Sequence, residues 1–295
     1  MTPHDAPRPH AEPLLKVRDL SISYDTGRIL GKRKAPVVRD VTFDIYPGET
    51  FGLVGESGSG KSTTGRAILR LLKPISGTIE FAGRDVTAFG RRTPLSYRRD
   101  VQAVFQDPSM SLNPRQPVST AVTETLKRHG VGDRAERERR ARQLFEHVGL
   151  LPGHLDRYPT ELSGGQQQRV AIARALSLSP RLVVCDEALS ALDLSTQGQI
   201  INLLADLQAE TGVSYLFIGH NLEVVKHISD RVAVMRLGRI VELAPAAELF
   251  DHPGHPYTRK LLGATPAAHP EGRELRRAAR AAFARAQEAG VVPAV

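Results

Sequence analysis

The 295-residue sequence has one cysteine, no tryptophan and no uninterrupted apolar stretch of membrane-spanning length. Because a membrane-spanning helix needs about 18 apolar residues in a row, we expect a soluble globular protein that reaches a membrane only through a partner. The single cysteine, Cys185, excludes an internal disulfide, a CxxC redox pair and a cysteine-ligated metal site, as is typical of a reducing compartment. Residues 1–13 contain four prolines and no apolar run, so they predict a disordered tail and no secretory signal.

The charge of the chain does not select a class of partner. There are 40 Lys and Arg residues against 32 Asp and Glu residues, which gives a formal net charge of +8. A modest basic excess over a mixed background is usually a solvated surface, although nucleic acid, anionic lipid and nucleotide are all compatible with it. At roughly 100–200 residues per domain, the length allows one large domain or two small ones.

Hydrophobic patterning predicts two kinds of sheet. Alternating segments at 14–24, 41–45 and 78–81 are typical of short antiparallel strands. Apolar strands that alternate with helices follow, and this order is typical of a parallel sheet in an α/β protein. We expect these later strands at 50–54, 182–185, 215–218, 232–235 and 239–243. We expect helices at 61–72, within 118–151, at 163–178, at 196–210 and from 222, with weaker ones at 257–262 and 275–289.

Two segments are interpreted as surface features without a specific function. The insert 25–36 has no periodicity and predicts a surface loop. The segment 133–142 carries charges of alternating sign, which is typical of a solvated helix face.

A phosphate-binding loop is predicted at residues 55–63, which read GESGSGKST and match G-x-x-x-x-G-K-[ST]. In this pattern glycines let backbone N–H groups turn toward phosphate oxygens, Lys61 neutralises charge, and Ser62 can hold Mg²⁺. The loop follows a buried strand and opens a helix, whose N-terminus favours anions. This context predicts nucleotide binding.

Two acidic residues, Asp186 and Glu187, follow the apolar strand 182–185. The carboxyl edge of a parallel sheet is where a second element of a nucleotide site is expected. Asp186 is predicted to support Mg²⁺ together with Ser62 and water, and Glu187 to polarise the water that attacks the γ-phosphate.

Residues 162–166 read LSGGQ and precede a helix with small residues on one face. Ser163 is a good N-cap for that helix, and the bare N–H groups of a helix start also bind anions. The chain thus offers two phosphate-binding helix ends but one complete P-loop. This count suggests that the second end completes a site on another subunit, in a dimer that closes around ATP.

In their order along the chain, these motifs resemble the nucleotide-binding subunits of ATP-binding-cassette (ABC) transporters, over about residues 14–243. The resemblance implies an α/β P-loop NTPase fold with an antiparallel β subdomain, a helical subdomain and a short C-terminal extension. It places the ATPase domain at 14–245, the helical subdomain at about 107–178 and the extension at 246–295. It also implies ATP and Mg²⁺ as the ligands.

The resemblance implies roles for individual residues, each of which taken alone also fits an ordinary structural role. Tyr24 would stack on adenine, Gln106 would be the Q-loop residue, and His220 would be the switch histidine. The residues implied to bind ATP are Tyr24, Gly55, Glu56, Ser57, Gly58, Ser59, Gly60, Lys61, Ser62, Thr63, Gln106, Ser163, Gly164, Gly165 and Gln166. Those implied to hold the metal are Ser62, Gln106 and Asp186. Those implied to be catalytic are Glu187, His220 and Lys61. Residues 190–193 (SALD) would form the D-loop. Around the switch histidine, Gly219-His220-Asn221 departs from the Ser-His-Asp that family members often have.

A narrower resemblance lies in 106–114 (QDPSMSLNP), 186–193 (DEALSALD) and 255–262 (HPYTRKLL). These segments are similar to the ATPases of the peptide and nickel importers, and the absence of C-terminal cysteines points to the subunit type without an iron–sulfur cluster. The resemblance implies a peripheral subunit on the cytoplasmic face of the membrane, with two permease subunits and a second cassette, identical or different. An extracellular binding protein would act indirectly. Oligopeptides or dipeptides are the expected cargo, with nickel, glutathione and short oligosaccharides as alternatives.

Three other functional hypotheses are alternatives to the transporter ATPase. A soluble cassette ATPase on ribosomes or DNA would fit the basic charge, but tandem cassettes or a coiled-coil insertion are missing, so no nucleic acid is expected. A cassette that senses ATP without hydrolysing it would not need Glu187 and His220. A small-molecule kinase would not need LSGGQ.

Overall fold

The computed structural model describes residues 12–24, 36–90 and 92–264. Three predicted segments lie outside or almost outside these ranges: the N-terminal tail, the insert 25–36 and the helix at 275–289.

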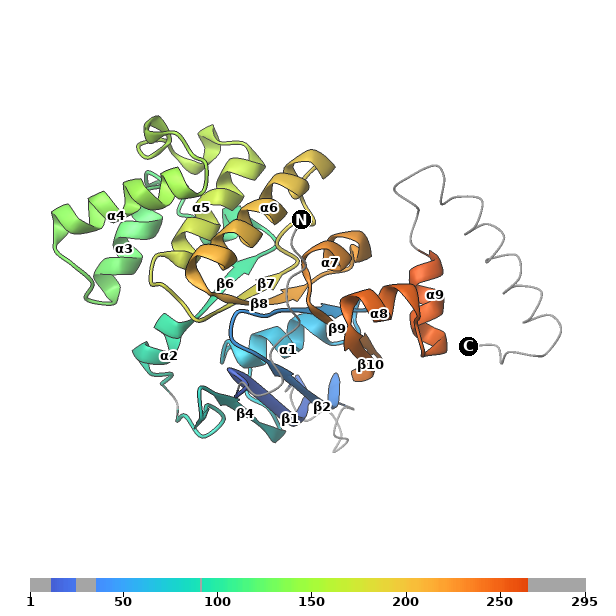
Figure 1. The fold of residues 1–295 in the computed structure, drawn as a ribbon. Coiled ribbons are helices and arrows are strands. Elements are labelled where there is room, and N and C mark those ends of the chain that lie inside the picture. Colours follow the sequence, from blue (N-terminus) through green and yellow to red (C-terminus); the bar gives the residue numbers. More distant parts are fainter. Residues whose placement is uncertain (1–11, 25–35, 91, 265–295) are drawn as a thin grey trace, which may run out of the picture.

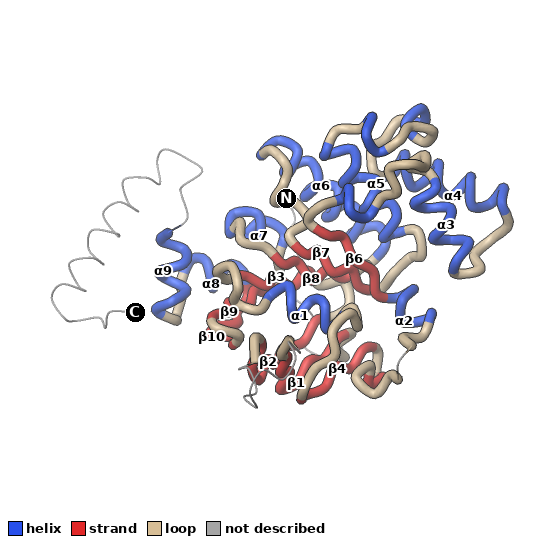
Figure 2. The backbone as a smooth tube through the Cα atoms, turned by 180° about the vertical axis from the view of Figure 1, so that it is seen from behind, coloured by secondary structure: helices blue, strands red, loops and turns tan. Residues whose placement is uncertain are grey.

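A six-stranded sheet runs through the middle of the molecule (Figure 2). Its strand order is β10-β9-β3-β8-β7-β6, in which β10 pairs antiparallel with β9 and the other pairs are parallel. The strands are β3 (Thr50–Val54), β6 (Val101–Phe105), β7 (Leu182–Asp186), β8 (Ser214–Ile218), β9 (Arg231–Arg236) and β10 (Arg239–Pro245). The predicted parallel sheet is confirmed.

A second, antiparallel sheet has the order β2-β1-β4-β5. It consists of β1 (Leu15–Ile22), β2 (Val38–Ile45), β4 (Ser76–Phe81) and the two-residue β5 (Arg84–Asp85). The three predicted antiparallel strands are therefore confirmed and lie in one sheet.

The helices are α1 (Lys61–Ile68), α2 (Leu95–Asp100), α3 (Thr120–Arg128), α4 (Arg134–His147), α5 (Gly164–Leu176), α6 (Leu194–Thr211), α7 (Leu222–Ile228), α8 (Ala246–Asp251) and α9 (Pro256–Ala264). In Figure 1, α3, α4 and α5 gather at one end of the molecule, and α8 and α9 lie at the other. Within the described ranges, no helix combines the length and hydropathy that a membrane span requires.

The central sheet separates two hydrophobic cores because side chains of a strand point alternately to its two faces. Val183 and Cys185 face a core shared with α5, α6 and α7. Leu182 and Val184 face a second core, formed with α1 and the antiparallel sheet. Cys185 is buried as a small apolar residue would be, and burial raises its thiol pKa to about 12.

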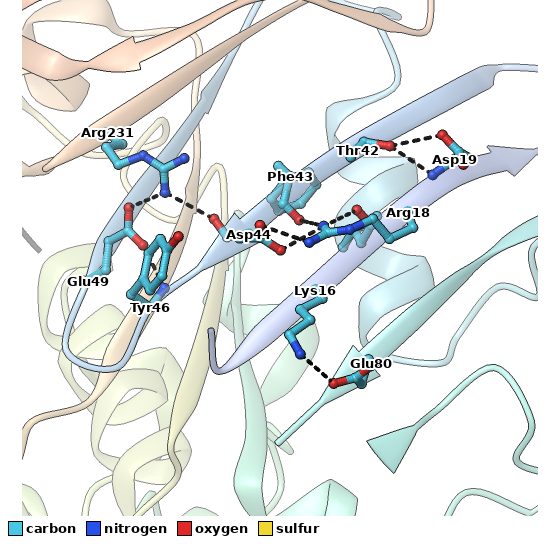
Figure 3. Close-up of polar contacts among 11 residues, drawn as sticks. Lys16, Arg18, Asp19, Thr42, Phe43, Asp44, Tyr46, Glu49, Glu80 and Arg231 are labelled. Carbon is cyan, nitrogen blue, oxygen red and sulfur yellow. Dashed lines mark hydrogen bonds and ion pairs between the residues drawn. The ribbon is translucent and has the colours of Figure 1, made fainter. Parts of the chain in front are cut away.

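Polar contacts join the antiparallel sheet to the central one (Figure 3). Arg231, at the start of β9, donates to the carbonyl of Asp44 at 3.3 Å and to the carboxylate of Glu49 at 3.1 Å. The Asp44 side chain in turn forms an ion pair with Arg18 of β1 at 2.7 Å. These contacts fix the start of β3, and with it the strand that leads into the predicted phosphate loop.

Two features differ from the predictions. The helix expected over 61–72 ends at Ile68. Two residues later, Arg70 takes a left-handed φ of 58°. The N–H of Leu71 then donates to the carbonyl of Arg66 at 2.9 Å, as in a Schellman ending. In addition, α2, β5, β6 and α8 were not predicted.

The segment 133–142 has the solvated character that its charges predict. It forms the N-cap and most of α4, and it is largely exposed. Two ion pairs four residues apart, Arg134–Glu138 and Arg140–Glu136, stabilise the helix surface, each at 2.9 Å.

Candidate active site

The predicted phosphate loop connects β3, all of whose residues are buried, to the start of α1. It starts at Gly55, whose φ is 149°. A Cβ at Gly55 would lie 2.2 Å from the carbonyl oxygen of Met235, so the end of β9 leaves no room for a side chain there. The first turn of α1 contains no acidic residue, and its N–H groups are therefore suited to an anion.

Lys61 lies folded back over the loop that precedes it. Its Nζ donates to the carbonyl oxygens of Gly55 and Glu56, both at 2.9 Å, and the residue is only 4% exposed. Burial lowers the pKa of Lys61, and the nearby Glu187 and Asp186 act in the opposite direction. A phosphate group beside Lys61 would supply the negative charge that this buried cation lacks.

Asp186 ends β7 directly beside α1. Its Oδ1 accepts a hydrogen bond from Ser62 Oγ at 2.7 Å, and the residue is 7% exposed. Burial raises the pKa of Asp186, while the Ser62 hydrogen bond acts against this shift. Two oxygen-bearing side chains from distant parts of the sequence thus meet at the carboxyl edge of the sheet.

Glu187 follows with a left-handed φ of 51°, and its N–H donates to the carbonyl of Ile218 at 2.9 Å. One of its carboxylate oxygens lies 3.8 Å from Nδ1 of His220, and both residues line one small pocket. The Glu187 side chain is 25% exposed, so water can reach it. The pair can therefore exchange a proton with a molecule in this pocket.

Asn221 caps α7 next to the histidine. Its side chain accepts from the N–H of Val224 at 3.4 Å and donates to Gln197 of α6 at 3.3 Å. An aspartate could also cap the helix, but it could not donate to Gln197. The departure from Ser-His-Asp therefore adds a contact between α7 and α6.

Two further predicted residues lie at this site. The hydroxyl of Tyr24 is 3.0 Å from Oγ1 of Thr63, and the tyrosine is 40% exposed, which leaves ring surface open. Gln106 directly follows Phe105, which is the register partner of Asp186 in the parallel pair β6–β7. Its exposed side chain therefore starts at the same sheet edge as the acidic pair.

The LSGGQ segment is separate from this cluster. Ser163 caps α5: its Oγ accepts from the N–H of Gln166 at 3.3 Å, and Gln166 Oε1 accepts from the N–H of Ser163 at 2.9 Å. Ser163 and Gly164 are exposed. In the part of the chain that the structure describes, no hydrogen bond or ion pair joins Ser163, Gly164, Gly165 or Gln166 to the loop 55–63.

One side chain at the loop was not predicted. Tyr257 of α9 is 5% exposed, and its hydroxyl accepts a hydrogen bond from the N–H of Glu56 at 3.3 Å. The tyrosine belongs to the HPYTRKLL segment, so the motif itself was visible in the sequence. Its contact with Glu56 was not visible in the sequence, because it joins residues 201 positions apart.

Two family models match the chain. The model described as "ABC transporter" matches residues 38–190, which is more than half of the chain. The model described as "Oligopeptide/dipeptide transporter, C-terminal region" matches residues 241–290, including the segment that carries Tyr257.

Curated relatives include the glutathione import ATP-binding protein GsiA of Salmonella choleraesuis, which is 52% identical over 271 residues. This match covers 90% of the chain and 43% of the relative. The protein of the same name from Escherichia coli K12 is 51% identical over 262 residues, with 88% and 42% covered. The chain thus spans less than half the length of these relatives.

Solved structures give the same fold. A dimeric ATP-binding cassette, MJ0796, bound to ADP and Pi in a post-hydrolysis state, has a TM-score of 0.70 and 29% identity, covering 79% of this chain and 98% of its own. The structure of cbiO1 from Clostridium perfringens, part of an ABC transporter complex, has a TM-score of 0.73 and 28% identity. That match covers 82% of this chain and 92% of cbiO1.

Proposed function

The chain belongs to the ABC transporter family, and from this premise we propose that it is the ATP-hydrolysing subunit of an importer. The observation that carries the proposal is the meeting of Lys61, Ser62, Asp186, Glu187 and His220 at one edge of the sheet. We assign residues 14–245 to the ATPase domain, with its helical subdomain at about 107–178, and residues 246–295 to the C-terminal extension.

The residues around Ser62 also fit Mg²⁺. Ser62 Oγ and Asp186 Oδ1 are 2.7 Å apart, and Mg²⁺ prefers oxygen ligands while it keeps water and phosphate oxygens in its remaining positions. Ser62, Asp186 and Gln106 would hold the ion, which when bound neutralises charge on the phosphates.

The chain's own residues supply positioning and proton transfer. The loop N–H groups and Lys61 hold the phosphates, and the Tyr24 ring stacks on adenine. Glu187 accepts the proton of the attacking water, and His220, 3.8 Å from Glu187, contacts the γ-phosphate. Because phosphoryl transfer depends chiefly on electrostatic positioning, these groups would supply this cassette's share of the catalytic site.

The second phosphate-binding helix end completes the site of another cassette. Ser163, Gly164, Gly165 and Gln166 would contact the nucleotide held by the partner's loop, so that ATP closes the dimer and hydrolysis opens it. The exposed N-terminus of α5 supports this arrangement, as does the dimeric state named for the structural neighbour MJ0796.

The helical region would dock on the permease. A groove of about 800 Å³ opens there, lined by α3, α4 and residues of 152–156. Gln106, between the acidic pair and this region, would transmit ATP occupancy to two permease subunits. In this arrangement the chain would lie on the cytoplasmic face of the membrane, and an extracellular binding protein would be an indirect partner.

Oligopeptides or dipeptides are the proposed cargo, because the C-terminal region matches the model of that transporter group. Glutathione is a second candidate, because the curated relatives at 51–52% identity are named as glutathione importers.

Purification of the tagged full-length chain from its native host in mild detergent tests the proposal. Mass spectrometry should identify two polytopic permeases and a cassette subunit. The Glu187→Gln variant should retain the same partners, because its change lies in the site and not on the helical region. Ribosomal proteins or nucleic acid in place of permeases would contradict the importer.

A further inference from the structure

The HPYTRKLL segment has no role in the proposed function so far, yet it contacts the phosphate loop. Tyr257, near the start of α9, is packed into the core formed with α5, α6 and α7. The guanidinium carbon of Arg236, at the end of β9, lies 4.9 Å from the centre of its ring. With its ring held on one side, the hydroxyl accepts from the N–H of Glu56 at 3.3 Å.

This hydrogen bond matters because of the peptide unit that makes it. The Gly55–Glu56 peptide consists of the Gly55 carbonyl and the Glu56 N–H. The carbonyl accepts from Lys61 Nζ at 2.9 Å, and the N–H donates to Tyr257. One peptide plane is thus held at one end by the loop lysine and at the other by α9. Rotation of this plane would take the carbonyl away from Lys61.

The start of α9 is itself anchored. Both carboxylate oxygens of Glu242 in β10 are used: one accepts from the N–H of Gly254 at 2.7 Å and the other from the N–H of His255 at 3.0 Å. His255 Nδ1 then accepts from the N–H of Tyr257 at 3.1 Å. The tyrosine therefore approaches the loop from a fixed support, and this support is continuous with β9, against which Gly55 is packed.

We propose that Tyr257 is a positioning residue for nucleotide binding: from the C-terminal extension, it fixes the Gly55–Glu56 peptide and thereby the place of Lys61. The inference rests on the proposed binding of ATP at this loop. It adds a function for the extension, which holds the phosphate loop in its binding conformation before nucleotide arrives. Preorganisation of this kind lowers the cost of ordering the loop on binding.

The test is Tyr257→Phe in the full-length chain, which keeps the ring and its contact with Arg236 and removes only the hydroxyl. The matched control is Tyr215→Phe in β8, because the hydroxyl of Tyr215 is buried without a hydrogen-bond partner in the described structure. A fluorescent ATP analogue gives Kd, and phosphate release gives KM and kcat. We expect Tyr257→Phe to raise Kd and KM about three- to tenfold, the effect of one lost hydrogen bond, with kcat within twofold of wild type.

Each outcome has a distinct meaning. Nucleotide binding by the wild type and Tyr215→Phe, together with an unchanged or lowered Kd in Tyr257→Phe, overturns the positioning role, whatever happens to the melting temperature. A fall in kcat at unchanged KM overturns it as well. Failure of the wild-type chain to bind nucleotide would instead contradict the proposed function.

Discussion

Two neighbouring acidic residues occupy different environments. Asp186 is the last residue of a buried strand and is bonded to Ser62. Glu187 has a left-handed backbone, which turns its side chain toward His220 and a pocket that water can enter. A buried carboxylate suits cation binding, and a partly exposed one suits proton transfer, so the two environments fit the roles proposed for the two residues.

Replacing Glu187 by Gln keeps the size of the side chain and removes its ability to accept a proton. We expect phosphate release to fall about 100-fold or more, with the Kd for ATP within threefold of wild type. Glu210→Gln, at the exposed C-terminal end of α6, is the control and should leave both values unchanged. Wild-type turnover by Glu187→Gln in the assembled complex would show that another group is the base.

The pKa of Asp186 has a consequence for stability. Burial raises this pKa in the folded chain, so the folded state binds the proton more tightly than the unfolded state. The free energy of unfolding therefore falls as the pH rises from the unfolded pKa, about 3.9, through the folded pKa. We expect Asp186→Asn to be more stable than wild type at pH 7, by on the order of 1 kcal/mol, and inactive as an ATPase.

Urea unfolding at pH 7 and at pH 4 measures the effect. The stability gap between Asp186→Asn and wild type should be smaller at the lower pH. The exposed Asp156 provides the control, since Asp156→Asn should show no such gap. A variant less stable than wild type at pH 7 would contradict the inferred cost of burying the ionised carboxylate.

At the scale of elements, local sequence patterns predicted those helices and strands whose formation depends on neighbouring residues. Residues 69–73 contain no glycine or proline, and the apolar residues up to Leu72 continue the helical pattern. The helix nevertheless ends at Ile68, because Arg70 adopts a left-handed backbone conformation. An arginine gives no sequence signal for such an ending. Strand β6 was missed because only Val101 and Val104 are buried, and its pairing with β7 joins residues about 80 positions apart, a relation that periodicity cannot reveal.

The functional site also divides into parts that local motifs predict and contacts that only the fold reveals. Motifs identified the loop, the acidic pair and the LSGGQ helix start, because each is a contiguous string with a defined chemistry. The approach of Ser62 to Asp186 and of His220 to Glu187 required the parallel sheet as a hypothesis, and the structure supplied the distances. The contact of Tyr257 could not be predicted, because no local pattern indicates that α9 lies against the Glu56 peptide.

Two helix caps provide a matched test of the α5 N-terminus. Ser163 caps α5 and Asp133 caps α4, where it accepts from the N–H of Glu136 at 2.8 Å. Either change to Ala should cost about 1 kcal/mol in the free energy of unfolding. Only Ser163→Ala should also reduce ATP hydrolysis, by tenfold or more, because only its helix end would meet a nucleotide. Equal hydrolysis rates in the two variants would limit Ser163 to a capping role.

At the scale of the whole molecule, the two phosphate-binding features stand apart. The loop, Lys61 and the acidic pair form one cluster between α1 and β7. The N-terminus of α5 is exposed and, among the described residues, makes no polar contact with that cluster. A site that needs both is therefore completed most simply by a second cassette, arranged so that each copy's exposed helix end covers the other's loop.

This arrangement predicts an ATP-dependent dimer of the chain. The Glu187→Gln variant should bind ATP without consuming it, so sedimentation should show a dimer with ATP and a monomer without it. Adding Ser163→Ala should return the variant to a monomer, because the helix end loses its contact with the partner's nucleotide. Adding Asp133→Ala should leave the dimer intact, because α4 carries a cap of the same kind but lies away from the nucleotide. A Glu187→Gln chain that binds ATP yet stays monomeric would mean that its partner is a different cassette.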